Sequence, residues 1–359
     1  MNIGNTRNAF TLVELMIVIV IIAILAGLTT IGTRVAIQKT KAATVSLTME
    51  QLSMAIEKYK SDIGEYPPDF TDLDAVARHI RKRWPRCEYP DVDEFLSYAR
   101  ARFYVDSNPP FGPASALIFW LGGFPDSNGK PAGFFLSPTN PLGVDDEKYE
   151  LKSSQREEPR FDFPDGTIHN MEFTYRRFQY NPDSREYEIV PVSCHGPVFQ
   201  PGKDDNKPVV YFCAAAPAQN SLGEGLELEE GAYQLSAMAV KYCAFNEKEP
   251  RLGYAVPYAK SPYGESWYEP ERFQLIHPGH DGQFNDPDEE KFSVDDHKKG
   301  LGQRRFRVDP TPAEDILYPY PSTAFGTVAD PDNTLNEIDD DNIVNFAEGG
   351  TLESLYPEQ

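Results

Sequence analysis

The side chains with the clearest chemical potential lie together in His277-Pro278-Gly279-His280-Asp281-Gly282, within a chain of 359 residues. Two histidines and a carboxylate serve as metal ligands or acid–base groups in many hydrolases. Proline and glycine between the histidines prevent the pair from lying one turn apart on a helix. The chain contains no Gly-x-Ser-x-Gly, His-Glu-x-x-His or phosphate-loop motif to accompany them. The sequence therefore predicts that the protein is not an enzyme.

A second unusual carboxylate belongs to Glu14, which interrupts the apolar stretch Phe10–Leu28. As one helix, residues 10–33 would be roughly 36 Å long, enough to cross the hydrocarbon core of a bilayer. A lone carboxylate in that environment costs on the order of 3 kcal/mol, so a cation at the same depth is expected. Cleavage between Ala9 and Phe10 would create an α-amine about one helical turn from Glu14. In a staggered bundle this amine could also meet Glu14 of a neighbouring copy.

The residues Ala9-Phe10-Thr11-Leu12-Val13-Glu14 and the following apolar run resemble the processing signature of type IV prepilins and type II secretion pseudopilins. In that family a dedicated peptidase cleaves before the phenylalanine and methylates its amine. The family's glutamate, at the fifth position of the mature chain, aligns subunits in a helical filament. The resemblance thus assigns processing to Ala9 and Phe10, and assembly to Phe10 and Glu14. Ala9 stands where the family usually has glycine. The stretch Tyr59–Pro67 also resembles the end of the long helix in major pseudopilins.

Other kinds of N-terminal segment fit the sequence less well. A secretory signal peptide has a more basic start and an uninterrupted apolar core, whereas Glu14 interrupts this one. Leu25-Ala26-Gly27 resembles a lipoprotein box, but Leu28 follows in place of the required cysteine. A membrane-anchored extracytoplasmic binding protein or enzyme is the alternative function, and it leaves Glu14 unexplained.

Composition limits the partners and the redox chemistry. The chain has 56 acidic and 34 basic residues, and its net charge of −22 repels nucleic acid. We therefore expect no nucleic-acid partner. A hydrophobic content of 40% is sufficient for a real core. The four cysteines form no Cys-x-x-Cys pair, and three disulfide pairings or buried thiols are all compatible with their spacing: Cys87, Cys194, Cys213 and Cys243.

Apolar side chains recur at helical spacing after the N-terminal run, at Val45, Met49, Leu52, Ile56, Tyr59 and Ile63. They predict one helix from about Thr11 to Asp62, ended by Gly64 and Pro67-Pro68. Shorter helices are expected at Leu73–Trp84, at Val92–Phe103 and at Pro113–Gly123, which is apolar enough to be buried. The first of these helices and the residues just after it carry a basic patch, expected to be a solvated face or a docking surface for an acidic partner: Arg78, Arg81, Lys82, Arg83 and Arg86.

Alternating runs of apolar and polar residues predict strands at Met171–Tyr180, Glu186–Val192, Val209–Ala214, Ala237–Phe245 and Phe273–His277. The fold class is therefore α+β, a pilin-like arrangement in which the long helix packs its apolar stripe on an antiparallel β-sheet. The expected domains are a leader at residues 1–9, a transmembrane and polymerisation helix at 10–33, its amphipathic continuation at 34–66, and an extracytoplasmic globular domain at 67–359. Compared with the family, residues of about 74–268 are a large insertion, and 273–346 contain the pseudopilin-like loops.

The loop after Phe273-Gln274-Leu275 and the acidic segment Asp339–Phe346 resemble two loops that enclose a structural calcium ion in major pseudopilins. By position, the resemblance gives calcium ligands at Asp281, Asp339, Asp340 and Asp341. Calcium requires six to eight oxygens, which carboxylates and exposed carbonyls can supply. A solvated acidic tail is the alternative for this region.

The resemblance therefore implies a structural subunit of an extracytoplasmic filament for type II-like secretion. Its partners would be prepilin peptidase, further copies of itself, other pseudopilins and the secretion machinery. Its location would be the inner membrane, crossed once, with the C-terminal domain in the periplasm.

Overall fold

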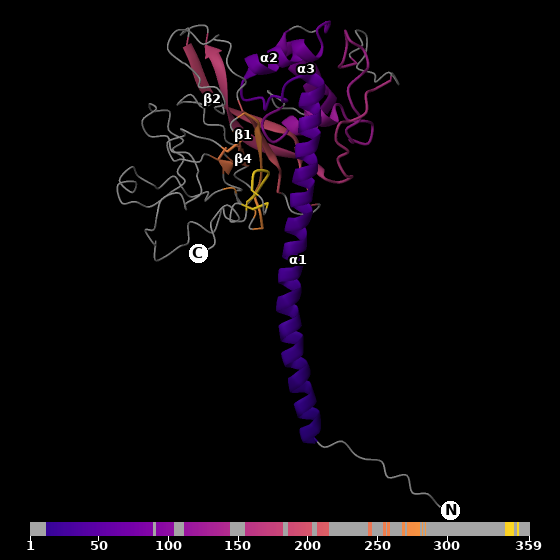
Figure 1. Ribbon diagram of the computed structural model, residues 1–359, viewed down its shortest axis with the longest axis vertical. Helices are drawn as coiled ribbons and strands as arrows, with labels where there is room; N and C mark the ends of the chain where they lie inside the picture. Colours follow the sequence, from indigo (N-terminus) through magenta and orange to yellow (C-terminus); the bar gives the residue numbers. More distant parts are fainter. Residues whose placement is uncertain are drawn as a thin grey trace, which may run out of the picture. The chain divides into compact units, whose positions relative to one another are not determined.

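The long helix predicted from the apolar repeat is present in the computed structural model as α1, Leu12–Ile63 (Figure 1). The structure describes residues 12–88, 91–103, 111–143, 155–181, 186–202, 207–214, 243–245, 254–255, 257–258, 268–269, 271–280, 282, 284, 342–347 and 350–351. The chain divides into two compact units, Met1–Thr44 and Val45–Gln359, so that α1 contributes to both. Among the described residues, no helix combines the length and the apolar character needed to cross a membrane.

The end of α1 lies within one residue of the predicted position, because a glycine stops it. Gly64 has a φ of +90° and its N–H donates to Lys60 O at 2.7 Å. This left-handed conformation after the last turn is the usual glycine stop signal of helices. The predicted apolar stripe is also confirmed, since Met49, Leu52 and Tyr59 are buried in the unit that begins at Val45.

Two short helices follow, α2 at Leu73–Arg83 and α3 at Val92–Phe103. Both were predicted, and both begin at an aspartate whose carboxylate accepts from backbone N–H groups of the first turn. Asp72 accepts from Asp74 N at 2.8 Å, and Asp91 accepts from Asp93 N at 2.9 Å. The predicted apolar helix before Gly123 is present in part, as the π-helix η1 at Ile118–Gly122.

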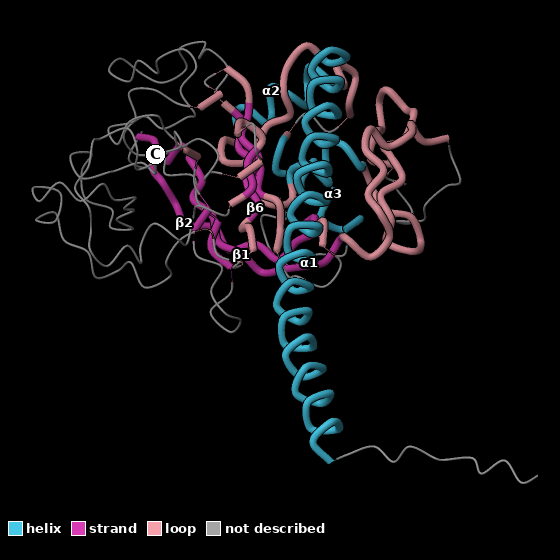
Figure 2. Tube along the Cα trace, turned by 60° about the horizontal axis from the view of Figure 1, so that its bottom comes forward, coloured by secondary structure: helices cyan, strands magenta, loops and turns pink. Residues whose placement is uncertain are grey.

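The strands in the described part of the chain form two antiparallel sheets where the sequence predicted one, and the fold class is α+β as expected. The first has the order β2-β1-β4-β5, and the second has the order β3-β6-β7. Figure 2 shows β1 and β2 of the first sheet and β6 of the second. Their bounds are β1 Ile168–Asn181, β2 Glu186–Phe199, β3 Val210–Cys213, β4 Cys243–Phe245, β5 Tyr254–Ala255, β6 Phe273–His277 and β7 Ile343–Val344. Strand β2 continues past its predicted end at Val192, because an edge strand tolerates Pro197 within its ladder.

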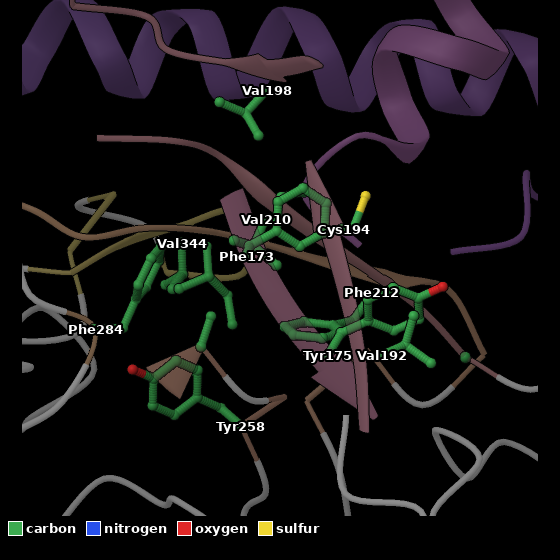
Figure 3. Packing of buried hydrophobic residues seen from close by; sticks show 14 of the residues in the cluster. Phe173, Tyr175, Val192, Cys194, Val198, Val210, Phe212, Tyr258, Phe284 and Val344 are labelled. Carbon is green, nitrogen blue, oxygen red and sulfur yellow. The ribbon is translucent and has the colours of Figure 1, made fainter. Parts of the chain in front are cut away.

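Among the described residues of the second unit, buried side chains gather in a cluster at the sheets and in an aromatic cluster. One surrounds the sheets and includes Phe173, Tyr175, Val210, Phe212 and Val344 (Figure 3). The other is aromatic and is built largely from residues between α2 and β1: Phe95, Phe103, Phe111, Phe119, Trp120, Phe124 and Phe134. The indole N–H of Trp120 donates to Pro68 O at 2.9 Å, which joins this group to the chain just after α1. The segment of about 74–268, predicted as an insertion, therefore supplies much of the core and is not a separate unit in the structure.

Candidate functional site

The N-terminal site is described only from the first turn of α1 onward. Ala9 and Phe10 lie outside the described residues, whereas Glu14 is in the first turn of α1. Around Glu14 the helix is apolar on every face, and its large side chains from Leu12 to Leu25 are between 44% and 73% exposed. A helix that is hydrophobic all round is built to be surrounded by other apolar groups.

The four carboxylates predicted to bind calcium, Asp281, Asp339, Asp340 and Asp341, lie outside the described residues. The segments next to them are nevertheless brought together by the second sheet. His277 at the end of β6 is opposite Ile343 of β7. In addition, the side-chain amide of Asn342 donates to Phe284 O at 3.1 Å. Calcium binding itself stays a prediction.

The loop that follows β6 has backbone carbonyls that could serve as oxygen ligands for a cation such as calcium. Two of them, Gly279 O and His280 O, accept hydrogen bonds from Lys207 Nζ at 3.2 and 2.7 Å. Within the described part of the chain, no three histidine, cysteine or acidic side chains are grouped so that they could hold a metal ion. The carbonyls of Gly279 and His280 can therefore bind a cation, and in the structure they bind the ammonium group of Lys207.

The two histidines of this loop occupy different environments. His277 is buried in β6, and His280 is exposed in the turn beyond it. The structure therefore does not present them as a pair of equivalent ligands.

A network of polar groups, which sequence reasoning missed, joins α1 to α2 and has its buried centre at Tyr59 and His79. His79 of α2 contacts Glu65 Oε1 through Nδ1 at 2.6 Å and Tyr59 OH through Nε2, also at 2.6 Å. A carboxylate only accepts hydrogen bonds, so Nδ1 carries the proton and Nε2 accepts from the tyrosine hydroxyl. Lys82 Nζ donates to the other oxygen of Glu65 at 2.9 Å. These hydrogen bonds hold α2 against the C-terminal end of α1.

Arg83 extends this network and corrects the prediction of an exposed basic patch. Its side chain is only 3% exposed, whereas Arg78 and Lys82 are 50% and 44% exposed. The guanidinium pairs with Glu157 and donates to Tyr59 OH at 3.0 Å. It also lies over the rings of Trp84 and Phe134, at 4.4 and 4.5 Å from their centroids.

A signal for this arrangement exists in the sequence of α2. Val76, His79, Ile80 and Arg83 follow the three-and-four spacing of one helix face, so the two polar residues share the buried face of the two apolar ones. Grouping the cations by charge alone hid this pattern.

Burial and charge together set the protonation of the network. Burial raises the pKa of Tyr59 to about 12, although Arg83 acts in the opposite direction. Burial also lowers the pKa of His79 against the pull of Glu65. For Glu65, burial acts to raise the pKa, but hydrogen bonds from His79 and Lys82 outweigh it and lower the pKa to about 2. The network is therefore a neutral tyrosine, a neutral histidine and an ionised glutamate.

We expect this network to make the second unit acid-sensitive below about pH 6.5, the ordinary pKa of histidine. The pKa of His79 is lowered in the folded protein, so the unfolded chain binds the proton more readily and stability falls as the pH drops below that value. Glu65 adds a further loss between about pH 4.5 and 2. The measurement is the melting temperature of the full chain in detergent against pH.

The control for this expectation is a second histidine variant. His79→Gln should remove much of the loss between pH 6.5 and 5, whereas His169→Gln should not, because His169 is exposed on β1. Identical pH profiles for His79→Gln and the unmodified chain would contradict the role of His79.

The comparisons with known proteins concern the N-terminus alone. Residues 4–30 match the family model described as the prokaryotic N-terminal methylation motif. No curated protein and no solved structure matches the chain. The match includes Ala9, Phe10 and Glu14, and it ends within α1.

Proposed function

We propose that the chain is a type IV pilin-like protein of the prepilin type, and that it is a structural subunit of an extracytoplasmic filament that serves type II-like protein secretion; the match of residues 4–30 to the N-terminal methylation motif supports the first part. The observation that carries the proposal is the methylation motif, which extends into α1, together with the apolar side chains that cover every face of that helix from Leu12 to Leu25. The resemblance of the loops after β6 and around β7 to those of major pseudopilins favours a secretion filament.

The subunit is inserted once in the inner membrane before assembly, with Val45–Gln359 in the periplasm. What supports this arrangement is the sequence of residues 12–33, in which Glu14 is the only charged side chain. The helix continues from this stretch directly into the second unit, so a single element anchors the subunit and carries its globular part.

The function is mechanical, and no reaction is catalysed. Prepilin peptidase removes residues 1–9 and methylates the amine of Phe10. In the filament, the amine of one subunit faces Glu14 of the next, where a charge pair at an effective dielectric near 20 gains a few kcal/mol. Apolar contacts between the helices supply the remaining attraction, and the amine–carboxylate pair selects the stagger.

The first test concerns processing. We expect the mature protein to begin at a methylated Phe10, as read from intact mass and from the N-terminal peptide. Ala9→Glu should block cleavage, because it places a charged, longer side chain at the cleavage site. Gly4→Ala is the matched control within the leader and should be processed normally. A mature chain that begins at Met1 or beyond Ala26 would refute the proposal.

A further inference from the structure

Lys207 places an ammonium group inside the turn that follows β6. Its Nζ donates to Gly279 O at 3.2 Å and to His280 O at 2.7 Å. Both acceptors are backbone carbonyls, and in both bonds the donor is the positively charged ammonium group of the lysine. Hydrogen bonds from a charged donor are roughly twice as strong as those between neutral groups.

The position of Lys207 is set by the sheet. Strand β3 begins three residues later, at Val210, and its first residue is opposite Ile276 of β6. Because the two strands are antiparallel, continuing this register places residue 207 opposite residue 279. The pairing of β3 with β6 thus places Lys207 next to the carbonyls that it contacts.

The turn is shaped to receive the lysine side chain. Gly282 has a φ of +80°, and a Cβ built there would lie 3.0 Å from Lys207 Cε. The N–H of Gly282 donates to Pro278 O at 3.1 Å, which closes the turn on itself. Glycine at position 282 therefore provides both the left-handed backbone and the space for the stem of the lysine.

We propose that the ammonium group of Lys207 is the resident cation of this turn, and that it takes the place which the resemblance to pseudopilins assigns to calcium. Calcium would need six to eight oxygens, and two carbonyls of the turn already accept from Nζ. The end of β6 is then held by the chain's own charge. The inference concerns the turn alone and is independent of the proposed filament.

The experiment compares the full chain in detergent with its Lys207→Met and Lys207→Arg variants, each in chelator, in calcium and in magnesium. Methionine keeps an unbranched stem over Gly282 but removes the charge. We expect the unmodified chain to melt at the same temperature in all three conditions. Lys207→Met should melt lower by about 2–4 °C, and Lys207→Arg, which keeps the charge, should recover part of the difference.

A local readout separates this effect from general destabilisation. Hydrogen exchange of the Gly282 amide should accelerate in Lys207→Met, because the turn that protects it loses its cation. Lys130→Met is the matched control, since Lys130 is a surface lysine paired with Asp162 and Asp165 at 3.2 and 3.3 Å. That variant should leave the exchange of Gly282 unchanged.

Two results would overturn the proposal. One is a calcium-specific rise in the melting temperature of the unmodified chain. The other is a Lys207→Met variant with unchanged melting and unchanged exchange at Gly282. Recovery of Lys207→Met by calcium would support the proposal, because it would show that the same carbonyls accept either cation.

Discussion

Gly133→Ala is expected to destabilise the second unit by about 3–5 kcal/mol, a large effect for one methyl group. Gly133 has a φ of +83°, and a Cβ built there would lie 1.7 Å from Glu157 O. The opposing atom belongs to the backbone, and the amide of Glu157 is already bonded to Phe134 O at 2.8 Å. The displacement would therefore also move the carboxylate that pairs with buried Arg83.

The matched control is Gly129→Ala. Gly129 has nearly the same φ, +80°, but a Cβ there would have no atom within 4 Å. The loss of stability in Gly129→Ala should therefore come from the strained backbone alone, and it should be about 1–2 kcal/mol. Denaturant unfolding of both variants in detergent measures the difference. Equal losses would show that the close approach of Gly133 to Glu157 contributes nothing.

Glu14→Ala is expected to abolish filament formation while leaving the amount of membrane-bound subunit unchanged or higher. Removing the carboxylate makes insertion of the helix less costly by up to about 3 kcal/mol. It also deletes the proposed contact with the amine of the neighbouring Phe10. Assembly and insertion should therefore move in opposite directions.

Imaging of sheared surface fractions and quantification of the membrane fraction should be done on the same cultures. Glu50→Ala is the matched control, because Glu50 is an exposed glutamate on the same helix. It should affect neither quantity beyond a small change. Normal filaments from Glu14→Ala would show that the carboxylate has no role in assembly.

The helices were predictable because their signals are local. Each signal lies within a few residues of the element that it predicts. The signals are the apolar stripe of α1, the glycine at its end and the aspartates that begin α2 and α3. The division into two sheets was not predictable, because it depends on pairing between distant segments. The two-residue strands β5 and β7 carry too short a pattern to be recognised without their partners.

The same distinction applies to the candidate sites. Ala9, Phe10 and Glu14 form one contiguous motif, and the family match covers all three. The buried role of Arg83 depends on Glu157, which is far from it in the sequence. The contact of Lys207 with the turn at Gly279 likewise depends on the register of β3 with β6. No local pattern contains either pairing.

The spread of partners along the second half of α1 has a consequence for folding in the cell. Near its end, Tyr59 is contacted by His79, which is synthesised soon afterwards. The partner of Glu57 is synthesised much later: it is Arg272, whose Nε donates to the glutamate at 2.9 Å. The neighbour of Ser46 is synthesised last: it is Gly350, which packs so closely that a Cβ built on it would lie 2.5 Å from the serine Oγ.

At roughly 10 residues per second, Gly350 joins the chain about half a minute after Ser46. These contacts of α1 therefore become possible in the order in which the chain is made, from the C-terminal end of the helix back toward Ser46. A subunit truncated before β7 would lack Gly350, so α1 would lose that neighbour at Ser46.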